Sequence, residues 1–442
     1  MSSSSSYGDF SKGFLEKGFG FETKGRKKRT LTEDGIPNSS SYIAYSHQDV
    51  ENEGMVSAEV VHDFLKYFEE AKHQLVETMK DLDVLMIGFC PKFAITYKRK
   101  TKPPSSFTLK SLILSMAFLC STRCLLLLFL ISAVPLGFII SLERSKSSTH
   151  VYEYKSNGWL RECSKWDDVN RRFLVSYMEG GIGEIVVSDN DHQTVIAERT
   201  VIKESELSGN ASLGIVIDRP RNRLVVASAD VLGNLFSAVA AYDLTTWNRL
   251  FLTHLSGSGD GKAFADDVAV DEEGNAYVTD AKQSKIWKVG VNGELLSIIK
   301  SPLFTFKEWY ENLIALNGIV YHPDGFLLVI HTVNGALYKI NTKTEEVKLV
   351  KFVGGGSLRF GDGLELLDSS RLIVAGNPSA RLVESLDGWE TATVVGKFFG
   401  PLHRVATAAT VKDGKVYLNH LVGFGIPNRK HNLVEAVFKP VR

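Results

Sequence analysis

Residues 150–442 predict an all-β fold, a six-bladed β-propeller, and three observations carry that prediction. β-branched and aromatic runs alternate with polar residues through almost the whole stretch, which is typical of half-buried strands. Gly, Asn and Asp separate these runs at hairpin spacing. A strand–turn–strand unit then recurs with a period of roughly 45–53 residues, as in proteins built from repeated modules.

Each repeat has room for four antiparallel strands. The pattern is clear in "DDVAVDEEGNAYVTD", which begins at Asp266 and places two strands around a short turn, and in the following "QSKIWKVGVNGELLSIIK". Four strands per unit, repeated radially, describe a propeller, in which few sheet edges stay exposed. The six units begin at these positions: Glu162, Leu213, Asp266, Asn317, Asp362 and Ala406.

The chain has 442 residues, and the part before the propeller divides into three segments. Residues 1–56 are rich in small and charged side chains and poor in large apolar ones, so we expect them to be disordered. Residues 57–103 predict an amphipathic helix over about 57–84, followed by a linker. Residues 104–141 predict a hydrophobic signal or transmembrane segment that leads into the propeller.

The uncharged stretch "CLLLLFLISAVPLGFIIS", residues 124–141, is about long enough to cross the apolar core of a bilayer. Basic residues precede it, so the positive-inside bias predicts a membrane-anchored protein with its propeller on the lumenal or extracellular side. A chain that began at Met116 would start with a secretory signal instead, and the propeller would again enter the secretory pathway. A buried core helix is the alternative, which Pro135 disfavours.

Composition excludes some classes of function. Lys+Arg and Asp+Glu are equal at 51 each, so net charge gives no reason to expect a nucleic-acid partner. Of the four cysteines only Cys163 lies in the propeller, which excludes a disulfide framework there. The sequence indicates no particular oligomeric state.

The first residues of the six repeats suggest a metal site. Equivalent positions of a propeller surround its central channel, and four of the six first residues carry oxygen donors: Glu162, Asp266, Asn317 and Asp362. Converging carboxylates would repel one another unless a cation joins them, and Ca²⁺ accepts carboxylate and amide oxygens from scattered chain positions. Asp267 is expected beside this site. The alternative is that these residues are strand ends facing solvent.

This arrangement resembles the calcium-dependent six-bladed propeller hydrolases: the senescence-marker, regucalcin and gluconolactonase group, the plant calcium-dependent phosphotriesterase-like proteins and, more distantly, the paraoxonases and strictosidine synthase. "RECSKW" keeps the family's first ligand and nearby Trp as Glu162 and Trp166. The Asn-Gly and Asp-Gly ligand motifs are matched at Asn317 and Asp362, whereas Asp266 stands where the family has Asn. The resemblance covers about two-thirds of the chain.

The resemblance implies a hydrolase for small esters, lactones or phosphotriesters, in which Ca²⁺ polarises the substrate and Asp362 is general base or nucleophile. Asp266 in place of Asn should strengthen cation binding and weaken Lewis acidity. Two alternatives remain: a catalytically inactive calcium-stabilised propeller used for binding, and a condensing enzyme of the strictosidine-synthase type. The paraoxonase histidine dyad is not evident, and we expect structural roles for its candidates: His331, His403 and His420.

Overall fold

The computed structural model describes residues 122–145, 147–187, 196–256, 261–425 and 428–441. The expectations for residues 1–56 and 57–103, and for the beginning of 104–141, lie outside these described residues. Helix α3, Thr122–Arg144, covers the whole uncharged stretch and contains Pro135. No helix in the described part of the chain is both long and apolar enough to cross a membrane, so the transmembrane prediction is not supported there.

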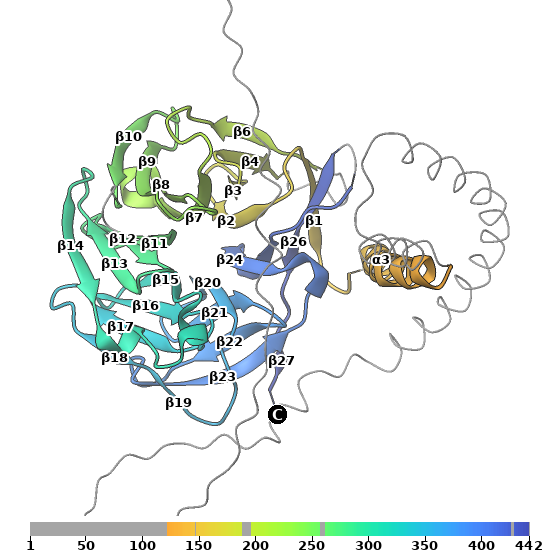
Figure 1. Cartoon of the computed structure of the whole chain (residues 1–442). Coiled ribbons are helices and arrows are strands. Elements are labelled where there is room, and N and C mark those ends of the chain that lie inside the picture. The colour runs from red at the N-terminus through yellow and green to blue at the C-terminus, as the bar shows by residue number, and fades with distance from the viewer. Residues whose placement is uncertain (1–121, 146, 188–195, 257–260, 426–427, 442) are drawn as a thin grey trace, which may run out of the picture. The chain divides into compact units, whose positions relative to one another are not determined.

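The strands after α3 form six mainly antiparallel sheets arranged as blades around a centre, which confirms the predicted propeller (Figure 1). Within each blade the strands follow one another from the centre outwards, because short hairpins join consecutive strands. Blade 1 contains β2 (Arg161–Asp167), β3 (Arg172–Tyr177), β4 (Ile182–Val186) and β6 (Arg199–Ile202). Blade 2 contains β7 (Ala211–Asp218), β8 (Arg223–Ala229), β9 (Ser237–Asp243) and β10 (Arg249–His254).

Blades 3 to 5 repeat this pattern. Blade 3 contains β11 (Ala265–Val270), β12 (Ala276–Asp280), β13 (Lys285–Val289) and β14 (Leu295–Lys300). Blade 4 contains β15 (Leu316–His322), β16 (Phe326–His331), β17 (Leu337–Asn341) and β18 (Val347–Leu349). Blade 5 contains β20 (Gly361–Leu366), β21 (Arg371–Gly376), β22 (Ala380–Glu384) and β23 (Thr391–Phe398), with β19 (Lys351–Phe352) and β27 (Lys439–Pro440) at its outer edge.

Blade 6 is assembled from both ends of the propeller sequence. Its inner strands are β24 (Ala406–Lys412), β25 (Lys415–His420) and β26 (Arg429–Glu435), and its outer strands are β1 (Val151–Ser156) and β5 (Ile196–Ala197). β1 pairs with β26 in antiparallel register from Val151↔Val434 to Ser156↔Arg429. These hydrogen bonds close the ring, and β26 is paired on both sides, with β25 and β1.

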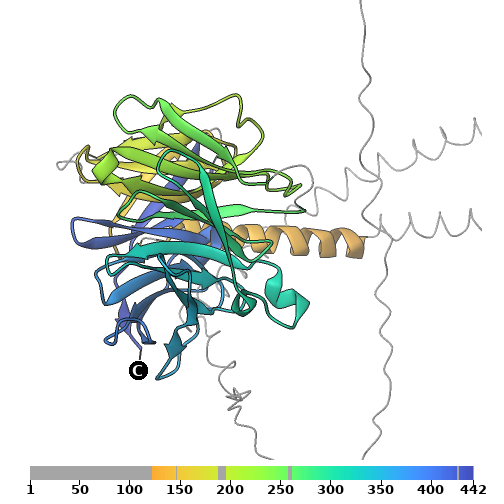
Figure 2. The same ribbon diagram turned by 90° about the vertical axis from the view of Figure 1, so that its left-hand side faces the viewer.

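The first strand of every blade lines the centre, and each of these six strands contacts the first strand of the blade on either side. Short 3₁₀ turns occur in the connections: η3 (Arg219–Arg221), η4 (Pro302–Phe304), η5 (Trp309–Asn312) and η6 (Leu402–Arg404). Figure 2 shows the blades from the side.

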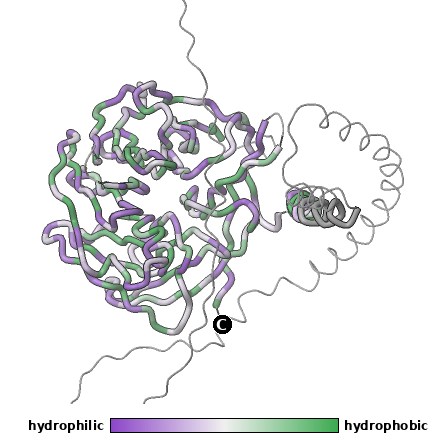
Figure 3. The backbone as a smooth tube through the Cα atoms, viewed as in Figure 1, coloured by the Kyte–Doolittle hydropathy of each residue, from purple (hydrophilic) through white to green (hydrophobic). Residues whose placement is uncertain are grey.

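The core lies between neighbouring blades. Apolar side chains of one sheet interlock with those of the next, for example Ile330 of blade 4 with Leu364 and Val374 of blade 5. Strands buried on both faces read as nearly continuous apolar runs, and Figure 3 shows apolar residues along the strands around the ring. Trp287 and Trp389 are fully enclosed in such layers.

Candidate metal centre

The first strand of each blade carries an irregularity near its beginning, and all six lie at equivalent positions. The register between first and second strands shifts between Arg161/Ser164, Ser212/Ile215, Ala265/Val268, Leu316/Ile319, Gly361/Leu364 and Ala406/Ala408. A bulge re-aims the side chains of its extra residues. The residues in the six bulges include the four predicted ligands: Glu162, Asp266, Asn317 and Asp362.

This register also corrects the sixth repeat. The sequence placed Ala406 as its first residue, but Ala406 pairs with His420 and the bulge falls on Thr407. The Thr407 hydroxyl donates a hydrogen bond to the backbone carbonyl of Glu162, and Asn419 Nδ2 donates to the same oxygen at 2.9 Å. Blade 6 therefore fixes the backbone that carries Glu162. The sequence did not predict this role of Thr407, because the sixth repeat had been aligned one residue too early.

Glycines allow the first strands to approach one another at the bulges. A Cβ on Gly318 would lie 2.2 Å from the carbonyl oxygen of Asp362, and one on Gly363 would lie 2.7 Å from that of Thr407. Both distances are shorter than a carbon–oxygen contact permits, so a larger residue would push the strands apart. In each Asn-Gly or Asp-Gly pair, the first residue therefore supplies a polar side chain, and the glycine allows the neighbouring strand to come close.

The electrostatics of Glu162 and Asp266 show that the carboxyl groups share one small region. Burial and the neighbouring charge of Asp362 raise the pKa of both side chains well above their usual values. Asp266 is buried, whereas Glu162 keeps partial contact with the channel although protein surrounds it. Like charges in a poorly solvated place favour protonated forms, so the ionised cluster needs a counter-charge.

Asp362 and Asn317 lie side by side at the same mouth. Burial raises the pKa of Asp362 to about 7, the charge of Asp267 adds to the shift, and hydrogen bonds from Asn317 and the Gly363 N–H oppose it. A carboxyl with a pKa near neutrality can exist in both protonation states at physiological pH. The geometry thus brings Glu162, Asp266, Asn317 and Asp362 together, on four different blades.

Asp267 connects two blades. Its Oδ2 accepts a hydrogen bond from the Ile319 N–H at 3.2 Å, and its Oδ1 accepts one from the Val268 N–H at 2.8 Å. Burial raises the pKa of Asp267 to about 6, and the charge of Lys165 opposes that shift. The side chain therefore supports the strands that carry Asp266 and Asn317, next to the predicted ligands.

Sequence reasoning missed a charge pair inside the channel. Lys165 and Glu365 occupy the first strands of blades 1 and 5, and Lys165 Nζ lies 2.5 Å from Glu365 Oε2. Both side chains are largely buried, and the ammonium group opposes the upward pKa shifts of Glu162 and Asp267. The two residues hold equivalent repeat positions, three residues after Glu162 and Asp362, but nothing in the sequence indicated that their strands face each other.

A cavity of about 10 Å³ lies among these groups, and its lining includes Glu162, Lys165, Asp267, Asn317 and Gly363. This volume accommodates about one water-sized particle. In the described part of the chain no group of three or more His, Cys, Asp or Glu has an arrangement ready to hold a metal. Of the four predicted ligands, Glu162 and Asn317 line the cavity, whereas Asp266 and Asp362 are not among its lining residues. The donor types nevertheless suit calcium, since they are carboxylate and amide oxygens and the carboxyl pKa values are raised.

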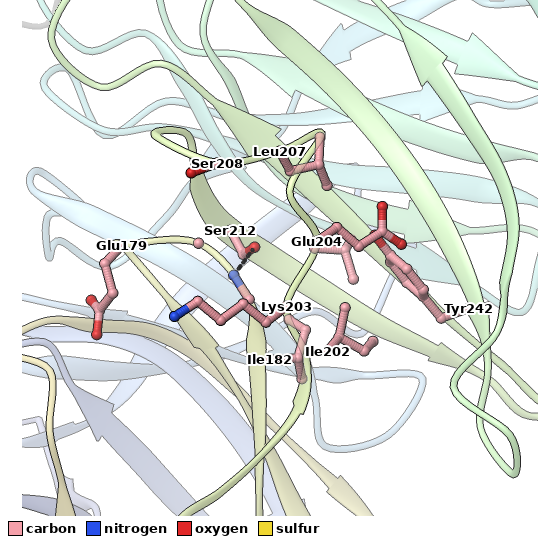
Figure 4. A pocket seen from close by; sticks show the side chains of 12 residues that line it. Glu179, Ile182, Ile202, Lys203, Glu204, Leu207, Ser208, Ser212 and Tyr242 are labelled. Carbon is pink, nitrogen blue, oxygen red and sulfur yellow. Dashed lines mark hydrogen bonds between the residues drawn. The ribbon is translucent and has the colours of Figure 1, made fainter.

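A larger cavity of about 40 Å³ lies elsewhere, between blades 1 and 2 (Figure 4). Ile182, Ile202 and Tyr242 supply apolar surface, and Lys203 and Glu204 supply charged groups. Its lining includes none of the four predicted ligands. The smaller cavity at the channel mouth is lined by two of the four, Glu162 and Asn317, together with Asp267.

The histidines have surroundings that suit structural roles. His331 and His420 are buried at the ends of the second strands β16 and β25, and burial lowers the pKa of each to about 4. His403 contacts Glu143 of helix α3. Trp166, part of the predicted first-ligand motif, packs against Phe173 in the core with its ring centroid 4.7 Å away.

Fold and site together define a six-bladed β-propeller with an acidic channel mouth. No family model and no curated protein matches the chain. Among solved structures, the major allergen Mala s 1 of Malassezia sympodialis is 16% identical, with a TM-score of 0.53 over 66% of this chain and 97% of that one. Because identity is so low, this likeness supports the fold alone.

Two further solved structures are more distant. A protein of unknown function from Bacteroides caccae is 15% identical, with a TM-score of 0.39 over 54% of this chain and 87% of that one. A chain of a nidogen/laminin complex is 13% identical, with a TM-score of 0.42 over 56% of this chain and 85% of that one. The function of this chain therefore has to be argued from its own site.

Proposed function

We propose that the channel mouth binds Ca²⁺ through Glu162, Asp266, Asn317 and Asp362 and hydrolyses a small ester, lactone or phosphotriester. One observation carries this proposal. Four blades present oxygen-bearing side chains at equivalent bulges, and the buried carboxyl groups raise one another's pKa. Such a cluster is unfavourable without a cation, and a bound cation removes the repulsion.

The protein residues have separate parts in this reaction. Bound calcium would act as a Lewis acid on the carbonyl or phosphoryl oxygen of the substrate. Asp362, which a bound cation would keep ionised, is placed to accept a proton from water or to attack the substrate itself. Asn317 donates to Asp362 and holds its orientation, and Asp267 supports the two strands beneath.

Asp266 sets this site apart from the calcium-dependent propeller hydrolases. A carboxylate in place of their Asn brings another negative charge, which strengthens cation binding and weakens polarisation of the substrate. The small cavity limits what can enter beside the ion. These two features favour, as a second candidate, a catalytically inactive propeller whose calcium holds the first strands together.

Turnover of phenyl acetate and δ-lactones, measured with and without EGTA, separates the two candidates. For a hydrolase we expect turnover that EGTA abolishes and that Asp362→Asn reduces by about 10²-fold or more, because the proton acceptor is lost. Asp324→Asn is the matched control, since Asp324 lies exposed at the opposite end of blade 4. Strong destabilisation by EGTA without turnover would assign the structural role, and absence of calcium binding by calorimetry would end both.

A further inference from the structure

One position of the second strands lies opposite the bulges of the first strands. In every blade two bulge residues face a single residue of the second strand, and the six facing residues are therefore equivalent. Three of them are polar and fully buried: Ser176, Thr279 and Asn419. The other three are apolar and equally buried: Ala227, Ile330 and Ala375. A buried hydroxyl or amide is unfavourable unless it forms hydrogen bonds, so the three polar residues require partners.

Ser176 and Asn419 find their partners in the bulge of blade 1. The Ser176 Oγ accepts a hydrogen bond from the Cys163 N–H at 2.9 Å. The Asn419 Nδ2 belongs to blade 6 and donates to the backbone carbonyl oxygens of Arg161 at 2.7 Å and of Glu162 at 2.9 Å. Two polar side chains from two blades therefore hold the backbone that carries the first predicted ligand.

Thr279 joins the bulges of blades 3 and 4. Its Oγ1 accepts a hydrogen bond from the Asp267 N–H at 3.0 Å and donates one to the carbonyl oxygen of Asn317 at 2.8 Å. Asn317 is the nearer of two acceptors, since the Asp267 carbonyl oxygen is 3.3 Å away. Asp267 directly follows Asp266 in its bulge. One buried hydroxyl thus connects the backbones of two predicted ligands on neighbouring blades.

The distribution of these polar residues follows the predicted ligands. Blade 2 has Ala227 opposite its bulge, and that bulge begins with Leu213, which offers no side-chain oxygen. A blade therefore forms without a polar residue at this position. Asp362 also faces an apolar residue, but there the close approach of Gly318 to its carbonyl oxygen already restricts the strand. Thr279 is thus placed where two ligand-bearing strands have to be held relative to each other.

We propose that Thr279 is a positioning residue that makes the channel mouth selective for Ca²⁺ over Mg²⁺. Ca²⁺ binds protein oxygens at about 2.3–2.6 Å, whereas Mg²⁺ demands about 2.0–2.1 Å. The side chains of Asp266 and Asn317 are short, so their oxygens can approach a smaller ion only if the two strands also move closer. The Thr279 hydroxyl opposes this movement because it fixes one backbone to the other. This inference rests on the proposed function, since it concerns the same four ligands.

Calorimetry of the full chain with Ca²⁺ and with Mg²⁺ tests the proposal. Thr279→Val keeps the size of the side chain and removes both hydrogen bonds. We expect this variant to bind Ca²⁺ about 10-fold more weakly, as for other residues that orient metal ligands, with Mg²⁺ affinity nearly unchanged. Thr279→Ser keeps the hydroxyl and should restore most of the lost selectivity. Thr279→Ala carries the same expectation as the valine variant and replaces it if that variant does not fold.

Thr410→Val is the matched control. The Thr410 Oγ1 is also buried and accepts a hydrogen bond from the Trp166 N–H at 2.9 Å, between blades 6 and 1. This variant should leave the ratio of the two affinities unchanged. A measurement without metal adds a second readout: the Asp267 amide should exchange its hydrogen faster in Thr279→Val than in the parent, because its acceptor is lost.

Three results would overturn the proposal. An unchanged ratio of Ca²⁺ to Mg²⁺ affinity in Thr279→Val would show that the hydroxyl does not set selectivity. Equal weakening of both ions would reduce its role to general stability, and an equal loss of selectivity in Thr410→Val would make any buried threonine between blades sufficient. A parent protein that binds neither ion would overturn the proposed function itself, and this outcome is distinguishable from the other three because they all require binding by the parent.

Discussion

In the absence of calcium, the propeller should lose stability as the pH rises from about 4 to about 7. Burial raises the pKa of Asp362 from 3.8 to about 7, so the folded protein binds this proton more tightly than the unfolded chain does. Stability is then complete below the unfolded pKa, and it falls as the pH rises from about 4 to 7. A shift of about three pKa units corresponds to about 4 kcal/mol, and Glu162 and Asp266 act in the same direction.

Thermal unfolding in EGTA at pH 5, 6, 7 and 8 measures this loss. Other carboxyl groups have the opposite linkage, for example Asp413, whose pKa Arg171 and Lys412 lower to about 2. The informative quantity is therefore the difference between the parent protein and Asp362→Asn, in which the amide cannot titrate. We expect the parent to lose about 8 °C of Tm relative to the variant between pH 5 and pH 8.

Calcium should remove this difference, because it binds the ionised folded form and stabilises it by mass action. Parallel pH profiles of the two proteins in EGTA would refute the reasoning, since they would mean that Asp362 titrates alike in folded and unfolded chains. A profile in which the parent gains stability towards pH 8 without calcium would show that the acidic cluster already has a counter-charge.

Three further predictions concern the same mouth. Calcium affinity should rise about 10-fold between pH 6 and pH 7 with release of about one proton per ion, which calorimetry in two buffers of different ionisation enthalpy measures; a pH-independent affinity contradicts the pKa assignment. Gly318→Ala should lower the free energy of unfolding by more than about 2 kcal/mol. The reason is that the new Cβ would lie 2.2 Å from the Asp362 carbonyl oxygen. Urea unfolding measures this loss, and stability equal to the parent would show that the strands can separate. Lys165→Met should cost about 3 kcal/mol by leaving Glu365 unpaired, and Glu365→Gln should restore most of it in a double-mutant cycle; additive losses would show that the pair is not coupled.

The pattern of apolar and polar residues within each repeat was sufficient to predict the six blades. Strand alternation and hairpin residues repeat along the chain, and each blade depends mostly on contacts between neighbours in sequence. The register of four predicted ligands also came from the repeat, because Glu162, Asp266, Asn317 and Asp362 begin equivalent strands. The sixth position was displaced by one residue, since the bulge at Thr407 spans fewer residues than the other bulges.

Contacts across the channel could not be predicted in the same way. Lys165 and Glu365 lie on blades 1 and 5, and their pairing depends on how far each strand is shifted along the channel. The contact between Glu143 and Arg404 joins the helix before the propeller to a loop near its end. Lys165 and Glu365 share a repeat position, but that position does not indicate which blades face each other, and no motif connects Glu143 with Arg404.

The joint between β1 and β26 determines when the proposed calcium site can form. During synthesis, β1 cannot pair with β26 until the last blade has left the ribosome. Glu162 receives its backbone hydrogen bonds from Thr407 and Asn419 of that last blade, so the binding site is completed only at the end of translation. A cation that binds only the closed ring would then stabilise chains in which β1 and β26 have paired, relative to chains in which they have not.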